Sequence, residues 1–441
     1  MNKILIVIFI FTITHCSFDN KTGIWKNSNE ISITEQNIFK DFETLYTDEK
    51  LFAELISPKN NANIILNKIV TSLDWTDEFY QNSNNSKNFS YKNLNKVIFK
   101  SKKLSRYKIN DKLLFNSDEV ILADKKGNVI FYSTKNKIIT YKFNFYKKRY
   151  RKLDKKLNLI IKDSIVYVAD NLGYLYAIDC NSKKLLWAKY YKIPFRSNLK
   201  IIGNKIILAD QNNSLYVVSK LNGERLKTHP TEETILKSDF YNSIALNNDS
   251  LFYLNTYGSF YSFNKKATNI NWFVSLNRSL DLNANNLFKS NPIISYGEKL
   301  IISTKPFLYI LDSNNGASLF KKTISSSLTP VASGNSLFIV TENNLLVCID
   351  LKSNKILYSV DIGQEISDYL NSKKKTINIK YFSIVNNNIL IFLDNSYFVI
   401  FNKNGKIEDI NKLKNRLETS PIYINNSILY LNKKNKLVIL N

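Results

Sequence analysis

The chain has 441 residues, with 62 Lys and Arg against 37 Asp and Glu, which gives a formal net charge of +25. Its 44% apolar residues exclude a disordered chain, and its 11 Gly and 7 Pro exclude a collagen-like one. With only two histidines, His15 and His229, the chain has almost nothing from which to build a histidine-rich metal site or a Ser-His-Asp triad. Length alone predicts about three domains.

The basic charge has two explanations. Lys, Asn, Ile, Phe and Tyr have A/T-rich codons and crowd this sequence, so a biased genome would produce a basic chain without selection for a basic surface. The alternative is attraction to anions, such as acidic lipid head groups or an acidic partner. A nucleic-acid partner is not expected, because the N-terminus has the features of an export signal.

Residues 1–15 have the pattern of a signal peptide. After a short basic start, residues 4–13 form an apolar run that is too short to cross a bilayer as a helix. Cys16 follows closely, and this arrangement resembles a bacterial lipoprotein signal, in which that Cys is lipidated, although His15 stands where a small residue is usual. The alternative is an ordinary secretory signal. Ser17, rather than Asp, favours delivery to the outer membrane.

Residues 16–90 are expected to be an irregular N-terminal segment that tethers the rest of the chain to the lipid anchor. Residues 35–52 and residues 61–73 could each form a short helix, and residues 81–88 read as a polar loop. We expect the segment to pack partly on the side of the following domain. The alternative is that it is largely disordered.

An internal repeat begins after this segment. The clearest copy is Val-Tyr-Val-Ala-Asp-Asn-Leu-Gly-Tyr-Leu-Tyr-Ala-Ile-Asp at residues 166–179, in which two runs rich in Val, Ile and Tyr flank a turn with Gly. Aligned on Tyr176, the repeat occurs eight times at spacings of about 44 residues. The aligned residues are Ile130, Tyr176, Tyr216, Tyr261, Tyr309, Val347, Phe398 and Val438.

Three further columns support this alignment. Three residues before the anchor stand Gly127, Gly173, Asn213, Gly258, Pro306, Asn344, Asn395 and Asn435, mostly Gly or Asn, which tolerate a positive φ. Six residues before it, seven copies have Asp124, Asp170, Asp210, Asn255, Ser303, Thr341 or Asn432, whose side chains can bond to the turn backbone. Eleven residues after it stand Tyr141, Trp187, Trp272, Phe320 and Tyr358, which we expect to dock between neighbouring repeats.

Eight all-strand units predict an all-β fold, an eight-bladed β-propeller of four-stranded antiparallel blades over residues 91–441. Helical repeats are excluded because the apolar period within each unit is two. The last copy supplies only three strands before the chain stops, and an open edge would invite aggregation. We therefore expect residues 97–99 to pair with residues 437–440 as the outer strand of the last blade. Cys180 and Cys348 lie in different copies and are expected to be buried apolar residues rather than a disulfide.

The unit Gly-Tyr-Leu-Tyr-Ala-Ile-Asp at residues 173–179, followed by Leu186 and Trp187, resembles the repeat of pyrroloquinoline-quinone-type propellers. Within that family, the lipoprotein-like leader, the length and the eight copies resemble the BamB group of the outer-membrane β-barrel assembly machinery. This resemblance implies a non-enzymatic scaffold without a cofactor. Its implied location is the periplasmic face of the outer membrane, and its implied partners are a BamA-like insertase, other assembly components and unfolded outer-membrane proteins.

The resemblance also implies a partner-binding loop with the pattern Leu-x-Leu-Arg. The nearest match here is Thr-Ile-Leu-Lys at residues 234–237, so Leu236 and Lys237 are the candidate contact residues. Lys in place of Arg loses planar bidentate pairing with a carboxylate. The acidic pair of the family would fall near residues 288–290, where no acid occurs. The alternative is that Leu236 and Lys237 are ordinary loop residues.

Two other functions remain open. A quinone-dependent oxidoreductase would need Ca²⁺, a catalytic Asp and a shaped cofactor chamber. The Asp residues that can be placed recur at repeat positions, which is typical of a structural role, and the chain has neither adjacent cysteines nor a phosphate-binding Gly loop. The third possibility is a periplasmic propeller that binds an unrelated ligand, for instance a cell-wall or lipid polymer.

Overall fold

The computed structural model describes residues 16–18, 25–27, 51–58, 63–233, 240–277, 287–326, 328–373 and 376–441. The chain divides into two units, Met1–Glu49 and Lys50–Asn441. In the first, β1 (Cys16–Phe18) pairs antiparallel with β2 (Trp25–Asn27). The expected signal peptide, and residues 35–50 of the first expected helix, lie outside the described residues. Among the described residues, no helix is long and apolar enough to span a bilayer.

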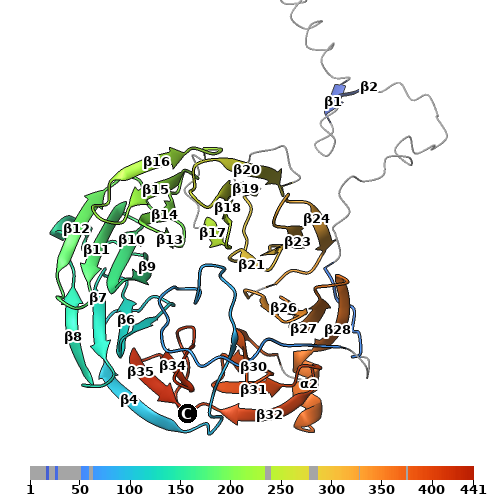
Figure 1. The fold of residues 1–441 in the computed structure, drawn as a ribbon. Coiled ribbons are helices and arrows are strands. Elements are labelled where there is room, and N and C mark those ends of the chain that lie inside the picture. Colours follow the sequence, from blue (N-terminus) through green and yellow to red (C-terminus); the bar gives the residue numbers. More distant parts are fainter. Residues whose placement is uncertain are drawn as a thin grey trace, which may run out of the picture. The chain divides into compact units, whose positions relative to one another are not determined.

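The second unit is a ring of eight antiparallel blades, as the repeat predicted (Figure 1). From the innermost strand outward, blades 1 to 4 are β5 (Leu114–Asn116), β6 (Glu119–Ala123), β7 (Val129–Ser133) and β8 (Ile138–Phe143); β9 (Leu157–Lys162), β10 (Ile165–Asp170), β11 (Tyr174–Asp179) and β12 (Leu185–Tyr190); β13 (Lys200–Ile202), β14 (Lys205–Ala209), β15 (Leu215–Ser219) and β16 (Arg225–His229); and β17 (Ser243–Leu246), β18 (Ser250–Leu254), β19 (Ser259–Asn264) and β20 (Ile270–Ser275).

Blades 5 to 8 follow the same order. They are β21 (Ile294–Tyr296), β22 (Lys299–Ser303), β23 (Leu308–Asp312) and β24 (Ser318–Lys322); β25 (Val331–Ser333), β26 (Ser336–Val340), β27 (Leu345–Asp350) and β28 (Lys355–Asp361); β29 (Ile379–Val385), β30 (Asn388–Leu393), β31 (Tyr397–Phe401) and β32 (Ile407–Lys412), with β3 (Asn88–Phe89) added on the inside; and β33 (Ile422–Ile424), β34 (Ser427–Leu431), β35 (Lys436–Leu440) and β4 (Val97–Lys103). The connections between blades hold η1 (Lys148–Tyr150) and α2 (Ile362–Tyr369).

The core of the ring lies between neighbouring blades. Inner strands such as β7 and β10 are apolar on both faces because each blade is covered on two sides, whereas the outer strand β12 is largely exposed. One of these cores joins Tyr167 of blade 2 to Leu208 of blade 3. All eight aligned anchor residues lie in the third strand of their blades, so the repeat alignment is confirmed.

The turn between the second and third strands has the predicted structure in most blades. Positive φ occurs at Gly127, Gly173, Asn213, Gly258, Asn344 and Asn435. In the shortened seventh copy it falls on Ser396, one residue after Asn395, and Pro306 of the fifth follows a cis bond. Side chains at the sixth position before the anchor accept hydrogen bonds from N–H groups two and four residues further on, at Asp124, Asp170, Asp210, Asn255 and Asn432.

The outer-strand aromatic residues dock against the next blade, also as predicted. The indole Nε1 of Trp187 donates to the carbonyl of Lys220 at 3.2 Å. A Cβ atom added to Gly223 would lie only 2.5 Å from the Trp187 ring, so the ring occupies the space of a side chain there. Trp272 packs in the same way against Gly316 of blade 5. Because these glycines have positive φ and no room for a side chain, the turn of one blade and the aromatic ring of the previous blade fit each other.

The ring closes as expected. β4 pairs antiparallel with β35, with Ile439 opposite Phe99 and Leu440 opposite Val97. Blade 8 thus takes three strands from the end of the chain and its outer strand from before the first blade.

Residues 67–91, which we call the axial segment, run through the centre of the ring (Figure 1). The segment bonds to the innermost part of all eight blades. In blade order the contacts are Trp75 with Phe115, Thr76 with Ile161, Asp77 with Lys200, Asn82 with Leu246, Ser83 with Ser295, Asn85 with Ala332, β3 with β29, and Ser72 with Asn425. Residues 51–58 pack on the side of the ring, where Ile56 pairs with Ser359 of β28.

The expected helix at residues 61–73 is wrong. Residues 63–73 contain no helix, and Val70 forms a bridge to Phe89. The predicted polar loop at residues 81–88 is present, but three of its side chains are buried, since Asn84, Asn85 and Asn88 are at most 3% exposed. The innermost strands leave unpaired N–H and C=O groups along the axis, and an Asn amide, which both donates and accepts, satisfies them. Tertiary hydrogen bonds therefore override the local helix pattern.

The axial segment should contribute strongly to stability. Asn85 donates to the carbonyl of Ala332 at 2.9 Å and accepts from its N–H at 3.0 Å, both in a buried position. We expect Asn85→Ala to lower the free energy of unfolding by about 2–4 kcal/mol, because two buried backbone groups lose their partners. Chemical denaturation measures this. The control is Asn82→Ala, an exposed side chain of the same segment. Equal stability of the two variants would contradict the buried role of Asn85.

Candidate binding site at the mouth of the central channel

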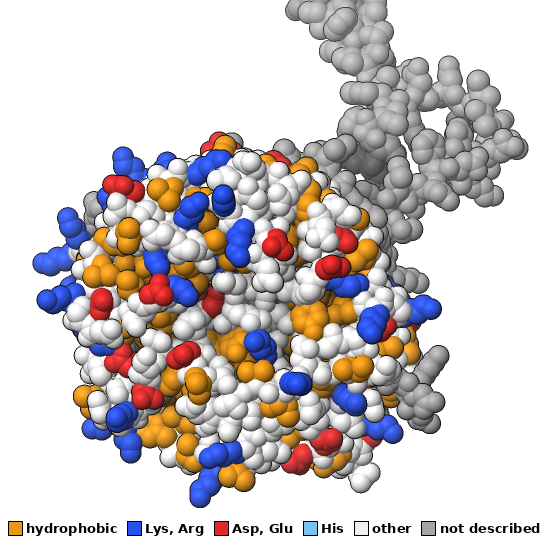
Figure 2. Space-filling view, in the orientation of Figure 1, with side chains coloured by type: hydrophobic (Ala, Val, Ile, Leu, Met, Phe, Trp, Pro, Cys, Tyr) orange, Lys and Arg blue, Asp and Glu red, His pale blue; other side chains and the backbone are white. Residues whose placement is uncertain are grey.

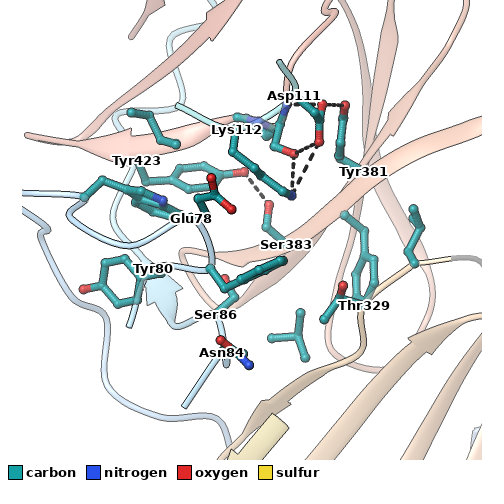
Figure 3. Close-up of a pocket in the computed structure, with 18 of the residues that line it drawn as sticks. Glu78, Tyr80, Asn84, Ser86, Asp111, Lys112, Thr329, Tyr381, Ser383 and Tyr423 are labelled. Carbon is teal, nitrogen blue, oxygen red and sulfur yellow. Dashed lines mark hydrogen bonds and ion pairs between the residues drawn. The ribbon is translucent and has the colours of Figure 1, made fainter. Parts of the chain in front are cut away.

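One face of the ring holds both the turns between second and third strands and the connections from one blade to the next, because antiparallel strands alternate in direction. On this face a pocket of about 270 Å³ opens beside the axial segment (Figure 3). The axial segment supplies Trp75, Glu78, Phe79, Tyr80, Asn84 and Ser86. The starts of several first strands supply other lining residues, among them Asp111, Lys112, Thr329, Pro330, Tyr381, Ser383, Ser420, Pro421 and Tyr423. Seen along its axis, the ring has hydrophobic side chains near its centre and many Lys and Arg side chains at its rim (Figure 2).

An aromatic cluster forms the apolar wall of the pocket. The ring of Trp75 lies 4.7 Å from that of Tyr80 and 5.3 Å from that of Phe89, measured between centroids. Phe89 in turn stacks on Tyr423 of blade 8 at 4.9 Å. Because Trp75 and Phe89 are also held by backbone bonds to the innermost strands, this wall is preformed.

Asp111 forms the polar corner of the pocket (Figure 3). Its carboxylate accepts hydrogen bonds from the Tyr381 hydroxyl, from the Ser420 N–H at 3.1 Å and from the Ser420 hydroxyl at 2.8 Å. The Lys112 ammonium lies 3.5 Å away and also donates to Ser420 Oγ. Burial by itself raises the pKa of Asp111, but Lys112 and the hydrogen bonds together hold it below its ordinary value. Asp111 is therefore a charged acceptor that is held by three hydrogen bonds and a nearby ammonium.

Glu78 is a second carboxyl with the opposite behaviour. Burial raises its pKa from 4.5 to about 8, and the negative charge of Asp77 adds to this rise, although the Leu159 N–H donates to its Oε1 at 2.7 Å. Asp77 itself forms a buried ion pair with Lys200, whose ammonium lies 2.6 Å away. Glu78 thus carries a proton at neutral pH and can act as a hydrogen-bond donor on the pocket wall.

The structure describes some of the residues that the sequence singled out and leaves others outside the described ranges. Leu236 and Lys237 lie outside the described residues, in the connection between β16 and β17, so their contact role stays a prediction. Cys16 lies in β1, and its acylation is likewise untested. Cys180 and Cys348 are buried and free, as expected. His229 lies on β16, where its Nε2 contacts the Ala267 carbonyl at 2.8 Å, and it does not line the pocket.

Sequence reasoning missed the axial residues of the pocket, because residues 16–90 were expected to be a tether. A signal was present: Trp75, Phe79 and Tyr80 form a compact aromatic group in an otherwise polar region, and aromatic residues are usually packed. In the part of the chain that the structure describes, no group of three or more His, Cys, Asp or Glu side chains could hold a metal ion.

Glu78 should make stability depend on pH. The folded state keeps this proton up to about pH 8, whereas an unfolded Glu loses it near pH 4.5, so the free energy of unfolding falls as pH rises between these values. Glu78→Gln removes this dependence. Its free energy of unfolding relative to wild type should rise by up to about 1.4 kcal/mol per pH unit in urea titrations from pH 5 to 8. Exposed Glu298→Gln is the control, and a flat difference for both variants would contradict the assignment.

Part of the chain is similar in sequence to known proteins. The sequence model of the family described as "Outer membrane protein assembly factor BamB" matches residues 145–359. A protein of that same description from Legionella pneumophila (strain Paris) is 22% identical over 200 residues. The match covers 42% of this chain and 48% of the relative, so it spans about half of the relative's length.

Solved structures extend the likeness to the fold of the whole ring. BamB from Moraxella catarrhalis has a TM-score of 0.60 at 13% identity, over 78% of this chain and 99% of that one. A quinohemoprotein alcohol dehydrogenase from Comamonas testosteroni has a TM-score of 0.62 at 9% identity, over 84% of this chain and 81% of that one. At these identities the structural likeness shows the fold alone. The chain is thus an eight-bladed β-propeller that is similar to BamB in sequence over part of its length and in fold over the ring.

Proposed function

We propose that this protein is a non-enzymatic scaffold of the outer-membrane β-barrel assembly machinery and binds a BamA-like insertase through loops of the pocket-bearing face. Other assembly components and unfolded outer-membrane proteins are its further partners. Acylation of Cys16 would hold it at the periplasmic face of the outer membrane, where the local concentration of these partners is high. The relation to BamB supports this role.

The observation that carries the proposal is the filled centre of the ring. The axial segment bonds to all eight blades, and Asn84, Asn85 and Asn88 are buried among them. Such a ring is rigid and offers the loops and the pocket of its face, rather than an open channel, for recognition. The aromatic wall and the hydrogen-bonding corner of the pocket suit a peptide segment, which presents apolar side chains and amide groups together.

A quinone-dependent oxidoreductase is the second candidate, because a quinohemoprotein dehydrogenase has the same fold. Ca²⁺ in such a site would need several ionised or neutral oxygen ligands with free lone pairs. At the channel mouth, Asp111 is already engaged by Tyr381, Ser420 and Lys112, and among the described residues no group of three or more Asp, Glu, His or Cys side chains could hold a metal ion. These residues do not fit a Ca²⁺–quinone pair. Absence of quinone-dependent absorbance after addition of quinone and Ca²⁺ is the expected result, and its appearance would favour the oxidoreductase.

The proposed partner-binding loop can be tested by replacing its apolar and basic residues with acidic ones. We expect the double variant Leu236→Asp and Lys237→Glu to lose most co-purification with the BamA-like partner from solubilised outer membranes, because an apolar contact and a cation are both replaced by negative charge. Thermal unfolding should stay nearly unchanged, since loop substitutions cost little.

The chain provides a matched control in a second Leu-Lys pair. Leu226 and Lys227 lie on the outer strand β16, where Leu226 is 54% exposed. Leu226→Asp with Lys227→Glu makes the same change of charge and should co-purify like wild type. Equal co-purification of both double variants would reject the site, and a wild-type chain that brings down no assembly component would reject the function.

A further inference from the structure

The connection between blades 1 and 2 is unusually basic. Residues 144–156 hold seven Lys and Arg among thirteen residues and a single acid, Asp154, whereas the whole chain has 62 Lys and Arg in 441. Codon bias acts along the entire chain and raises Lys everywhere, so it does not explain a local concentration. The chain has only seven arginines, and two of them, Arg106 and Arg151, line one pocket beside this connection.

The fold gathers cations from four segments around one concave site. A pocket of about 530 Å³ is lined by residues that precede β5, by the turn after β6, by β8 and by the basic connection. No Asp or Glu is among the lining residues, and the cations are Arg106, Lys126, Lys142, Lys148, Arg151 and Lys155. These segments are the turns and connections that belong to the same face as the aromatic pocket.

Buried contacts of Lys155 fix the conformation of the connection that lines this pocket. Lys155 is 1% exposed, and its ammonium donates to the carbonyl oxygens of Tyr150 and of Leu153, the latter at 3.0 Å. It also lies 5.2 Å from the centre of the Tyr146 ring. These contacts fold the connection back on itself, so that Lys148 and Arg151 are held at the pocket rather than extended into solvent.

Neighbouring acids leave the pocket strongly positive. Asp154, which is half-exposed, lies 3.0 Å from Lys125 and 3.7 Å from Lys126. Asp124 and Asp170 are buried and accept backbone N–H bonds in their turns. Among the described residues, none of Arg106, Lys142, Lys148 and Arg151 has a carboxylate within 4 Å of its charged nitrogens.

We propose that this pocket binds an anion that carries two or more phosphate groups. Four cations without a carboxylate partner around one cavity, Arg106, Lys142, Lys148 and Arg151, favour a ligand with several negative charges. Arg guanidinium groups pair bidentately with phosphate oxygens, while Lys acts as a point charge. The compact, concave shape fits a phosphate cluster better than an extended acidic peptide. A soluble polyphosphate and a phosphorylated lipid head group share this chemistry.

The test uses the full chain with Cys16→Ser, so that an acyl chain does not contribute to membrane binding. Pyrophosphate is titrated by calorimetry, and sedimentation measures binding to vesicles that contain cardiolipin, whose head group carries two phosphates, or to vesicles of phosphatidylcholine alone. We expect the double variant Arg106→Gln and Arg151→Gln to weaken pyrophosphate binding at least tenfold. The control, Lys265→Gln with Lys266→Gln, removes two exposed cations from the outer turn of blade 4 and should bind like the parent chain.

The outcomes separate the two sources of phosphate. Loss of binding to cardiolipin vesicles in the Arg variant, together with loss of pyrophosphate binding, supports a lipid head group. Loss of pyrophosphate binding alone supports a soluble anion. No binding of pyrophosphate by the parent chain, equal binding by the two double variants, or binding of a poly-glutamate peptide in place of pyrophosphate would overturn the proposal.

Discussion

Every blade of this ring depends on a neighbour on each side, because both of its faces are apolar. An open ring would expose one face of blade 1 and one of blade 8 to water, at a cost of about 25 cal/mol for each Å² of apolar surface. The antiparallel pairing of β4 with β35 removes those exposed faces. Since the closing strand precedes blade 1 and the other three end the chain, the two ends of the propeller are joined within one sheet, and neither can fray without breaking it.

A closed ring of this size creates a second problem at its axis. The eight innermost strands have one edge without a partner, and buried backbone groups without hydrogen bonds are costly. The axial segment solves this with backbone bonds, with the short strand β3 and with buried Asn amides. Lys200, which is fully buried, is neutralised by Asp77 of the same segment. Residues before the repeats are thus part of the propeller rather than a linker to it.

The pocket-bearing face combines two different chemistries. Near the axis, Trp75, Tyr80 and Tyr423 form an apolar wall beside Asp111, which suits peptide-like groups. Towards the rim, Arg106 and Arg151 belong to a pocket without acids, which suits phosphate. The scaffold role that we propose would use both kinds of contact. The proximity of the two sites on one face follows from blade topology.

Most of the ring could be predicted from sequence because its determinants are local. Gly or Asn three residues before the anchor marks a positive φ, and Asp or Asn three residues earlier bonds within the same turn. Each blade can therefore be recognised from its own residues, without reference to the other blades. Repetition in eight copies then made the alignment reliable. It also showed that the last copy lacks its outer strand, which the strand beginning at Val97 supplies. Cys180 and Cys348 were correctly expected to be buried and free.

Tertiary structure alone decided the centre of the molecule and the candidate site. Residues 63–73 have a helix-like pattern, and residues 81–88 are as polar as any surface loop, yet both are fixed by hydrogen bonds to strands up to several hundred positions away. The aromatic pocket is built in the same way, from Trp75 and Tyr423. Local sequence encodes turns and strand periods, because these depend on neighbours along the chain. What lines a channel depends on which backbone groups the closed ring leaves unpaired, and only the assembled ring defines them.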